Sequence, residues 1–262
     1  MHATSARGDG PGSVRLAVIT DVHANLPALN VALEAIEPLG CDRIVHVGDA
    51  IGIGPFPAET LSRLLSEPRM QFVMGNHDAY FANGLPTPCP VWMSADEWAH
   101  QMWTHAAVND ADPSFREVVQ DWPRRLDDEV SGVRVRWQHY GLAADGETFV
   151  SVVDDPDAAT LDGIFGISGS IGAPDTPDVL FFGHHHPAMD LMGESGVRYV
   201  NPGALGTGGE GIARFAVLDI AGDGRWTVTH HAAAYDPEPV MRAFDEREVP
   251  AREEIREFFF GR

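Results

Sequence analysis

The sequence predicts an α/β fold with its chemistry at the carboxyl ends of strands. Short apolar runs at 14–20, 44–47 and 72–74 alternate with stretches of helical spacing, which is the pattern of parallel βαβ units. Clusters of Asp, Asn and His directly follow these runs. Open α/β sheets place ligand-binding residues in such loops, outside the carboxyl ends of their strands. We therefore expect one site that is built by several strand ends.

The composition excludes several classes of protein. The 262-residue chain carries a net charge of −21, and all 18 of its basic residues are Arg. The absence of Lys excludes a lysine Schiff base and a Walker-type phosphate loop. The acidic balance argues against a protein that holds long nucleic acids, because that task needs a basic face. No apolar stretch is long enough for a membrane span, so we expect no membrane association.

The N-terminus and the cysteines indicate an intracellular protein. Residues 1–13 are rich in Gly, Ser and polar residues and lack the apolar core of a signal peptide. We interpret them as a flexible tail and expect a cytoplasmic location. Cys41 and Cys89 fit neither a zinc motif nor a disulfide framework, so we expect reduced thiols.

In the N-terminal part, three predicted strands alternate with two predicted helices. In chain order these are strand 14–20, helix 29–36, strand 44–47, helix 58–66 and strand 72–74. The first strand is almost continuously apolar, which is typical of a strand buried on both faces. The third leads into Gly75-Asn76-His77-Asp78, which we interpret as a tight turn.

The rest of the chain is predicted to hold an insertion and further strands. Residues 80–125 contain four of the six tryptophans and interrupt the alternation, so we expect a helical insertion near the site. Downstream we expect strands at 133–139, 150–153, 179–182, 197–200, 215–220 and 226–230, with a helix at 157–167. The last three strands are assigned to a second sheet half. One domain is expected over 14–235, with 236–262 as its C-terminal helical extension.

Five clusters contain residue types that bind metals. They are Asp21 with His23, Asp49, Asn76 to Asp78, His139, and His184 to His186. Asp, His and Asn together suit manganese, iron or zinc better than calcium. An Asp-x-His pair alone is more often a turn residue beside a strand-end histidine. Gly-Asn-His-Asp after a strand is more specific, because a turn needs neither its Asn nor its His.

Within a cluster, ligands two residues apart can act together. Asp21 and His23 lie in an extended loop, so their side chains can point the same way, and the same holds for His184 and His186. His185 between them points away. The histidines outside these clusters, among them His46, His100 and His105, are expected to be structural, with a substrate contact from His100 or His105 as the less favoured alternative.

In this order and these strand-end contexts, the clusters resemble the calcineurin-like metallophosphoesterase family, most closely its small bacterial and archaeal phosphodiesterases. The resemblance covers Leu16 to Ile220. It includes Asp-Val-His-Ala-Asn-Leu-Pro-Ala-Leu at 21–29, Gly-Asp-Ala-Ile-Gly-Ile-Gly-Pro at 48–55 and Asn-Pro-Gly at 201–203. It implies a four-layer αββα sandwich, in which two mixed sheets lie face to face with helices outside.

The resemblance also implies a role for each residue of the clusters. One metal ion would be held by Asp21, His23 and His186. The second would be held by Asn76, His139 and His184, and Asp49 would bridge both. His77 would contact the phosphate or protonate the leaving group, with Asp78 either orienting it or serving as a cap. Asn25 and His185 are expected to contact the substrate.

The sequence departs from the family in several places, and its helical insertion is longer than in the smallest members. Tyr140 follows His139 where the family usually has glycine. His185 stands where threonine is common. The late Gly-rich loop at 206–209 lacks the usual charged residues.

A charge balance supports a two-metal site. Two divalent cations bring a charge of +4, which only Asp21 and Asp49 offset among the ligands. The remaining +2 suits a hydroxide together with a phosphodiester anion. We expect two divalent ions (manganese, iron, zinc or nickel, with manganese favoured) and hydrolysis of a small phosphate ester, specifically a phosphodiester, by a metal-activated hydroxide.

Three alternatives to this function stay open. The same site could serve a phosphomonoesterase or a protein phosphatase, or the fold could be a non-catalytic interaction scaffold. The presence of all seven ligand positions and of His77 favours an enzyme over a scaffold. A homo-oligomer is compatible with the sequence.

Overall fold

Two five-stranded mixed sheets form the centre of the molecule. The computed structural model describes residues 12–262 except 86 and 92, so most of the predicted tail and two positions of the predicted insertion lie outside the described residues. Among these residues, the strand order is β10-β9-β1-β2-β3 in the first sheet and β4-β5-β6-β8-β7 in the second. The α/β architecture with two mixed sheets is the one expected from the sequence.

The first sheet has three parallel strands and an antiparallel pair. The parallel strands are β1 (Val14–Ile19), β2 (Arg43–Val47) and β3 (Met70–Val73). The antiparallel strands are β9 (Ile212–Ile220) and β10 (Trp226–Ala234), and β9 pairs with β1. The assignment of these two strands to the second sheet half was wrong, because their partner lies some 200 residues upstream, with Val14 opposite Ile220.

The second sheet has a parallel centre and two antiparallel edges. Its strands are β4 (Arg125–Val130), β5 (Val133–Gln138), β6 (Val179–Phe181), β7 (Met189–Met192) and β8 (Arg198–Asn201). Strands β5, β6 and β8 are parallel, whereas β4 and β7 are the edges. The predicted strand at 150–153 is not formed, and only an isolated bridge joins Leu142 to Phe149.

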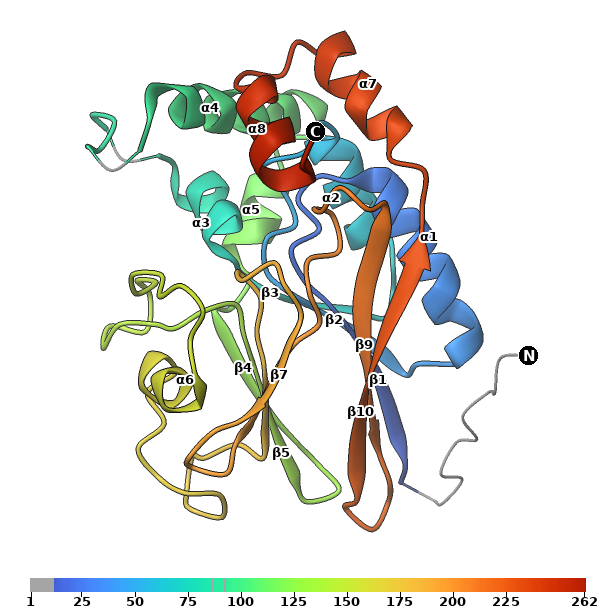
Figure 1. The fold of residues 1–262 in the computed structure, drawn as a ribbon, viewed down its shortest axis with the longest axis vertical. Helices are drawn as coiled ribbons and strands as arrows, with labels where there is room; N and C mark the ends of the chain where they lie inside the picture. The colour runs from blue at the N-terminus through green and yellow to red at the C-terminus, as the bar shows by residue number, and fades with distance from the viewer. Residues whose placement is uncertain (1–11, 86, 92) are drawn as a thin grey trace.

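Helices cover the outer faces of both sheets (Figure 1). Apolar side chains from both sheets meet in one core, which includes Leu16, Val45, Trp137 and Phe181. The outer face of the first sheet shares a core with α1 (Leu26–Ile36), α2 (Pro57–Leu65) and α7 (Glu238–Glu246). A short 3-10 turn (Glu37–Leu39) follows α1. On the second sheet, α6 (Ala158–Ile164) packs against the outer face through Leu161.

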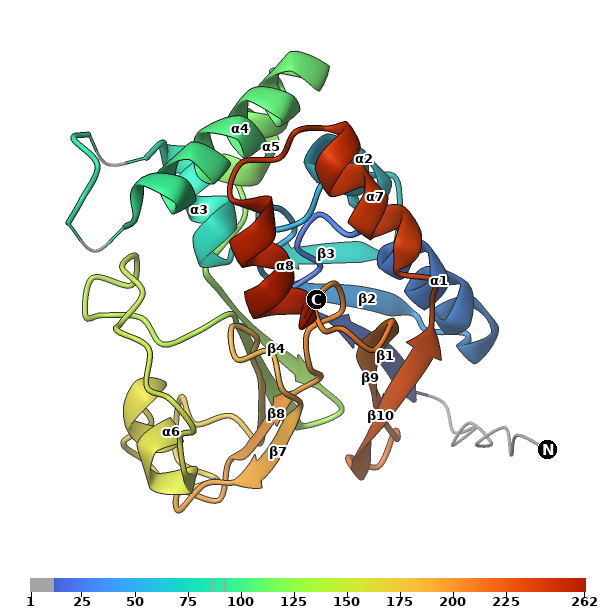
Figure 2. The same ribbon diagram turned by 45° about the horizontal axis from the view of Figure 1, so that its top comes forward.

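The remaining helices lie over the carboxyl ends of the parallel strands (Figures 1 and 2). They are α3 (Asn76–Asn83), α4 (Ala95–Ala111), α5 (Phe115–Gln120) and α8 (Arg252–Phe260). Gly75-Asn76-His77-Asp78 is therefore the beginning of a helix and not an isolated turn. None of the helices in the described part of the chain combines the length and apolarity that crossing a lipid bilayer requires.

Candidate metal centre

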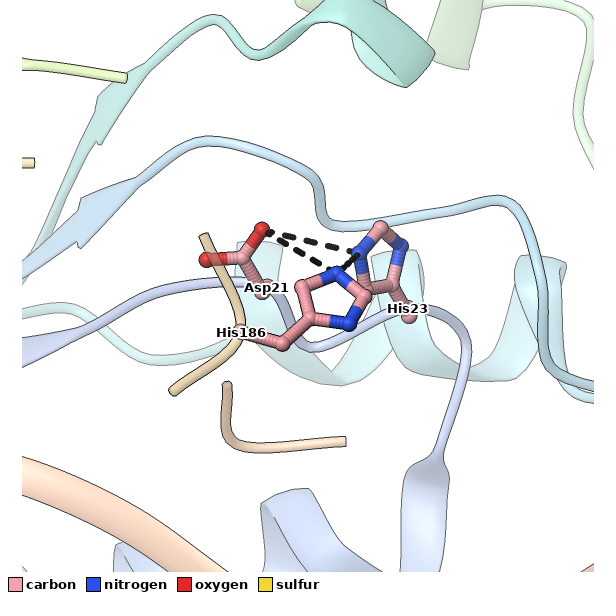
Figure 3. A group of neighbouring side chains, drawn as sticks. All are labelled: Asp21, His23 and His186. Atoms are coloured by element: carbon pink, nitrogen blue, oxygen red, sulfur yellow. Dashed lines mark hydrogen bonds and ion pairs between the residues drawn. The ribbon is translucent and has the colours of Figure 1, made fainter. Parts of the chain in front are cut away.

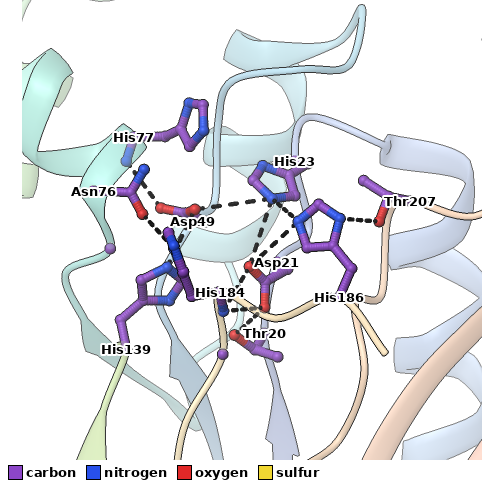
Figure 4. A network of polar contacts seen from close by, with 12 residues as sticks. Thr20, Asp21, His23, Asp49, Asn76, His77, His139, His184, His186 and Thr207 are labelled. Atoms are coloured by element: carbon purple, nitrogen blue, oxygen red, sulfur yellow. Dashed lines mark hydrogen bonds and ion pairs between the residues drawn. The ribbon is translucent and has the colours of Figure 1, made fainter. Parts of the chain in front are cut away.

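The predicted ligands follow five parallel strands, three from the first sheet and two from the second. Figure 4 shows that the structure brings their side chains together. Three groups among the described residues have donor atoms that all lie within 4.8 Å of one another. They are Asp21–His23–His186, His23–Asp49–His77 and Asp49–His139–His184. Because neighbouring groups share a member, the donors form one continuous cluster.

The first group fits a single divalent cation (Figure 3). Nε2 of His23 lies 3.1 Å from Nε2 of His186. Oδ1 of Asp21 lies 3.5 Å from the first of these nitrogens and 3.9 Å from the second. Metal–ligand bonds of about 2.0–2.2 Å place the ligand atoms of one ion roughly 3–3.6 Å apart. The three donors are thus close to the spacing that one ion imposes.

The group formed by Asp49, His139 and His184 offers a buried imidazole nitrogen to a second cation. Nδ1 of His139 lies 2.8 Å from the carbonyl oxygen of Val47, to which it can donate only as N–H. The other ring nitrogen, Nε2, is buried and faces Oδ2 of Asp49, so it is the atom that a cation would bind. Oδ1 of Asn76 and Nδ1 of His184 lie 3.0 Å apart beside it.

Asp49 lies between the donors around His23 and those around His139. Its Oδ2 is 3.2 Å from Nε2 of His139 and 3.8 Å from Nε2 of His23. Its Oδ1 accepts a hydrogen bond from the backbone N–H of His77 (2.9 Å). A side chain at Gly75 would collide with this carboxylate, because a Cβ there would lie 2.1 Å from Oδ1. The position is therefore suited to a bridging carboxylate and depends on Gly75.

The backbone of the ligand loops is strained. Asp21, His23, Asp49 and His184 all have a positive φ, between 47° and 68°. Non-glycine residues seldom adopt this conformation, and such strain is concentrated at functional sites. Hydrogen bonds to Asp21 hold the loops in place, since the backbone N–H of His184 donates to its carboxylate at 3.1 Å.

Two further side chains support the histidine loop. The Nδ2 of Asn201 donates to the carbonyl oxygens of Gly183 and His185, which gives the Asn-Pro-Gly motif a structural role. Oγ1 of Thr207 lies 3.0 Å from Nδ1 of His186. A role for Thr207 could not be predicted from sequence, because Thr207 lies in a Gly-rich loop that approaches the site only in the folded chain.

The protonation of the donors largely suits a metal. Burial raises the pKa of Asp21, but the hydrogen bond from His23 and nearby histidine charges outweigh it and hold the pKa well below its usual range. Burial also opposes ionisation of Asp49, yet the charge of His139 keeps its pKa low. Burial lowers the pKa of His184 and of His186 to about 4, so both are neutral near pH 7.

His139 is the exception among the imidazoles. Burial alone would lower its pKa, but the charge of Asp49 and a hydrogen bond to it raise the value to about 9. A cation at this position would therefore displace a proton from His139, as is usual when a metal binds. The donor set contains carboxylate, imidazole and amide groups but no thiolate, because both free cysteines, Cys41 and Cys89, lie outside it.

The sequence of the chain matches the family model of the calcineurin-like phosphoesterase superfamily domain over residues 14–223. The match covers well over half of the chain. This protein belongs to the calcineurin-like phosphoesterase superfamily. Its clustered His and Asp side chains are consistent with the dimetal site that is typical of this superfamily.

Individual proteins resemble this member of the superfamily at low sequence identity. An uncharacterized protein of Methanocaldococcus jannaschii is 25% identical over 78% of this chain and 82% of its own length. A hypothetical protein from Pyrococcus horikoshii has a TM-score of 0.72 at 20% identity, with 95% of this chain and 99% of that one covered. A metallophosphoesterase from Sphaerobacter thermophilus has a TM-score of 0.64 at 24% identity, covering 91% and 96%.

His77 of this phosphoesterase is oriented by a residue that the sequence did not indicate. Nε2 of Gln101, on α4, lies 2.9 Å from Nδ1 of His77. Since an amide nitrogen can only donate, the ring proton of neutral His77 lies on its Nε2. Burial lowers the pKa of His77 to about 4, although the charge of Asp49 partly offsets this.

Asp78 does not orient His77. Its carboxylate accepts hydrogen bonds from the backbone N–H groups of Asp49 (2.8 Å), Ala50 (3.0 Å) and Gly75 (2.9 Å). Its role as a catalytic partner is therefore corrected to the alternative, a cap that fixes two ligand loops. Burial, together with the charge of Asp49, raises the pKa of Asp78 to about 7.

Of the two expected substrate contacts, that of Asn25 is corrected, while that of His185, a half-buried residue, stays a prediction. Asn25 is fully buried and caps α1 by accepting from the N–H of Ala28, while its amide nitrogen donates to Gly206 and Tyr235. These bonds occupy the side chain. The ring of His185 packs against those of Tyr140 and Phe182, and its Nε2 is buried.

The other histidines and Tyr140 have packing roles. Tyr140 is buried, and its ring lies 4.7 Å from that of His184, which it supports from the side of the second sheet. His46 is buried in β2 beside the rings of Phe72 and Trp122, which stack on each other. His100 and His105 are buried on α4.

Proposed function

We propose that this protein is a two-metal phosphodiesterase that hydrolyses small phosphate diesters. The observation that supports the proposal most strongly is the position of Asp49, which belongs to donor groups on both of its sides. A carboxylate has two oxygens that can be shared between two cations. When bound, such a pair of cations stabilises the phosphoryl charge and generates the nucleophile from water at neutral pH.

The residues of the chain have distinct tasks in this reaction. Asp21, His23 and His186 would hold one cation, and Asn76, His139 and His184 the other. His77 would donate a hydrogen bond from its Nε2–H to the departing alcohol oxygen and stabilise the charge that develops there, because Gln101 occupies its Nδ1. Tyr140 and Thr207 would keep their neighbouring histidines in the orientation that binding needs.

Charge supports a diester of modest size as the substrate. Asp21 and Asp49 leave two positive charges of a dication pair uncompensated, which suits one hydroxide-equivalent and the single negative charge of a diester. The net charge of −21 disfavours long nucleic acids. The mixed carboxylate, imidazole and amide donors suit manganese, which we propose as the working metal.

Assays of two substrates and two variants test this proposal. We expect manganese-loaded protein to hydrolyse bis(p-nitrophenyl) phosphate faster than p-nitrophenyl phosphate. Asp49→Asn should lose metal and activity together, because it removes the charge that both cations share. His77→Ala should retain its metal and lose about 10²–10⁴-fold in turnover.

Three outcomes would contradict the proposal or its parts. Faster hydrolysis of the monoester would indicate a phosphomonoesterase. Absence of turnover with either substrate, in protein shown to contain two metal ions, would favour a non-catalytic scaffold. Loss of metal from His77→Ala would show that His77 is a ligand and not a hydrogen-bond donor to the substrate.

A further inference from the structure

A cavity of about 970 Å³ adjoins the metal centre on the side of His77. It lies between α4 and α8, which are neighbours above the strand ends (Figure 2). His77 forms part of its wall, and so does Phe259, whose ring lies 5.6 Å from that of His186. The cavity is thus placed where the group leaving the phosphate would be received.

The charged residues that line this cavity are all acidic. Asp96 and Glu97 come from α4, and Glu254 and Glu257 come from α8. None of the four forms an ion pair with any described residue, and no Arg lines the cavity. Burial raises the pKa of Glu97, which indicates that its charge is incompletely solvated. Within the part of the chain that the structure describes, the four carboxylates therefore have no cationic partner.

The apolar part of the cavity wall is also unusual. Phe258 lines the cavity and is 84% exposed although it is a large aromatic residue. The cavity is also lined by Ile53, Ile255 and Phe259. A cation can bind over an aromatic face, and quaternary ammonium groups are commonly recognised in this way. Carboxylates beside aromatic rings are thus suited to a cation on a carbon frame.

Gln101 gives a second and independent indication of a ligand. It is 1% exposed and lines the cavity, and its Nε2 bonds to His77. Its Oε1 is buried and has no hydrogen-bond partner among the described residues. An unpaired acceptor is costly inside a protein, so a donor supplied by a ligand or its water would stabilise it.

We propose that this cavity binds the alcohol part of the diester and selects alcohols that carry an ammonium group on an apolar carbon frame. The proposal rests on the phosphodiesterase function above and extends it to a class of substrate. During hydrolysis the water oxygen bonds to phosphorus and the bond from phosphorus to the alcohol oxygen breaks. One proton of the water passes to that alcohol oxygen, to which the Nε2–H of His77 donates a hydrogen bond. Alcohols that bear a further phosphate or carboxylate are repelled by the four carboxylates.

A pair of isosteric substrates tests this selectivity. Methyl choline phosphate and methyl neohexyl phosphate have alcohols of the same shape, but only choline is charged. We expect manganese-loaded protein to show a kcat/KM at least about tenfold higher for the choline diester. Equal values, or a preference for the neohexyl diester, would overturn the proposal.

Variants of the acidic wall provide the matched comparison. The double variant Glu97→Gln/Glu254→Gln should bring the choline-to-neohexyl ratio towards one, mainly through the KM of the choline diester. The control Glu246→Gln removes the same kind of charge from an exposed position on α7, outside the cavity, and should leave the ratio unchanged. An unchanged ratio in the double variant, or an equal loss in the control, would contradict a local role.

Failure of this inference differs from failure of the proposed function. If bis(p-nitrophenyl) phosphate is hydrolysed while the isosteres do not differ or are both left intact, the phosphodiesterase function stands and the ammonium selectivity is wrong. If no diester is hydrolysed by protein that contains both metal ions, both proposals are wrong.

Discussion

Two buried carboxylates of this structure, Asp49 and Asp78, have different roles. Asp49 directs its Oδ2 towards imidazole nitrogens, whereas Asp78 directs both of its oxygens towards backbone N–H groups. The first arrangement leaves negative charge available to a cation. The second uses the charge to hold the chain at Asp49 and Gly75, so that it positions the ligand without binding the metal itself.

This difference predicts the behaviour of Asp78→Asn. The amide has one acceptor oxygen in place of two, and its NH₂ group would face a backbone N–H. We expect the free energy of unfolding to fall by about 2–4 kcal/mol and the affinity for metal to fall with it. Urea unfolding of metal-free protein and calorimetric titration with manganese measure the two effects. Full stability with a selective loss of turnover would instead support a catalytic role for Asp78.

Residue types and their order were enough to predict which side chains meet. The seven predicted ligands do lie together, although their binding of metal stays a prediction. Gln101 and Thr207 could not be predicted, because their contacts with His77 and His186 depend on how α4 and a late loop pack. Asn25 was wrongly assigned to the substrate, because position in a motif does not show which way a side chain faces.

At the scale of elements, the centre depends on strand ends and on helices that cover them. The apolar strands that precede ligands were recognisable from sequence, because burial on both faces produces continuous apolar runs. Strand β4 (Arg-Leu-Asp-Asp-Glu-Val) and strand β7 are polar or exposed edges, so their sequences carry no such signal. The sheet to which β9 and β10 belong is decided by pairing with β1, which a local pattern cannot show.

Helix α8 is held in place mainly by its last turn and by one arginine. Phe260 is buried and lies against Phe244 of α7, while Arg256 donates to the carbonyl oxygen of Met241 and pairs with Asp245. The Asp245 partner of this ion pair is largely exposed to solvent. We therefore expect the contact between Phe260 and Phe244 to contribute most to the stability of α8.

Phe260→Ala should therefore loosen α8. We expect a loss of about 3–5 kcal/mol in the free energy of unfolding if the vacated space does not collapse. Hydrogen exchange should show faster exchange in 252–262 than in the sheets. The exposed Phe258→Ala serves as the control, since it removes the same ring without creating a cavity. Similar destabilisation by both variants would show that α8 is not anchored by Phe260.

At the scale of the whole molecule, buried histidines make the fold sensitive to acid. Burial, reinforced by the charge of His139, lowers the pKa of His46 to about 3, and neither of its nitrogens has a hydrogen-bond partner among the described residues. The unfolded chain takes up a proton at His46 below pH of about 6.5, whereas the folded chain does not. Stability is therefore complete above that pH and declines as the pH falls towards 3.

His46→Leu should remove this part of the acid sensitivity. The side chain stays similar in size but cannot be protonated, so the decline in unfolding free energy should be smaller by up to about 1.4 kcal/mol per pH unit. Urea unfolding at several pH values between 4 and 7 measures the slope, and a chelator in all samples excludes effects of metal loss. An identical slope in the variant and in the parent protein would show that His46 is not buried in its neutral form.

The most direct test of the two-metal centre is a crystal of manganese-loaded protein measured at a wavelength where manganese scatters anomalously. The proposed centre predicts two anomalous peaks, one beside Asp21, His23 and His186, the other beside Asn76, His139 and His184, with Asp49 in contact with both. A single peak, peaks elsewhere, or a second ion that does not touch Asp49 would contradict it.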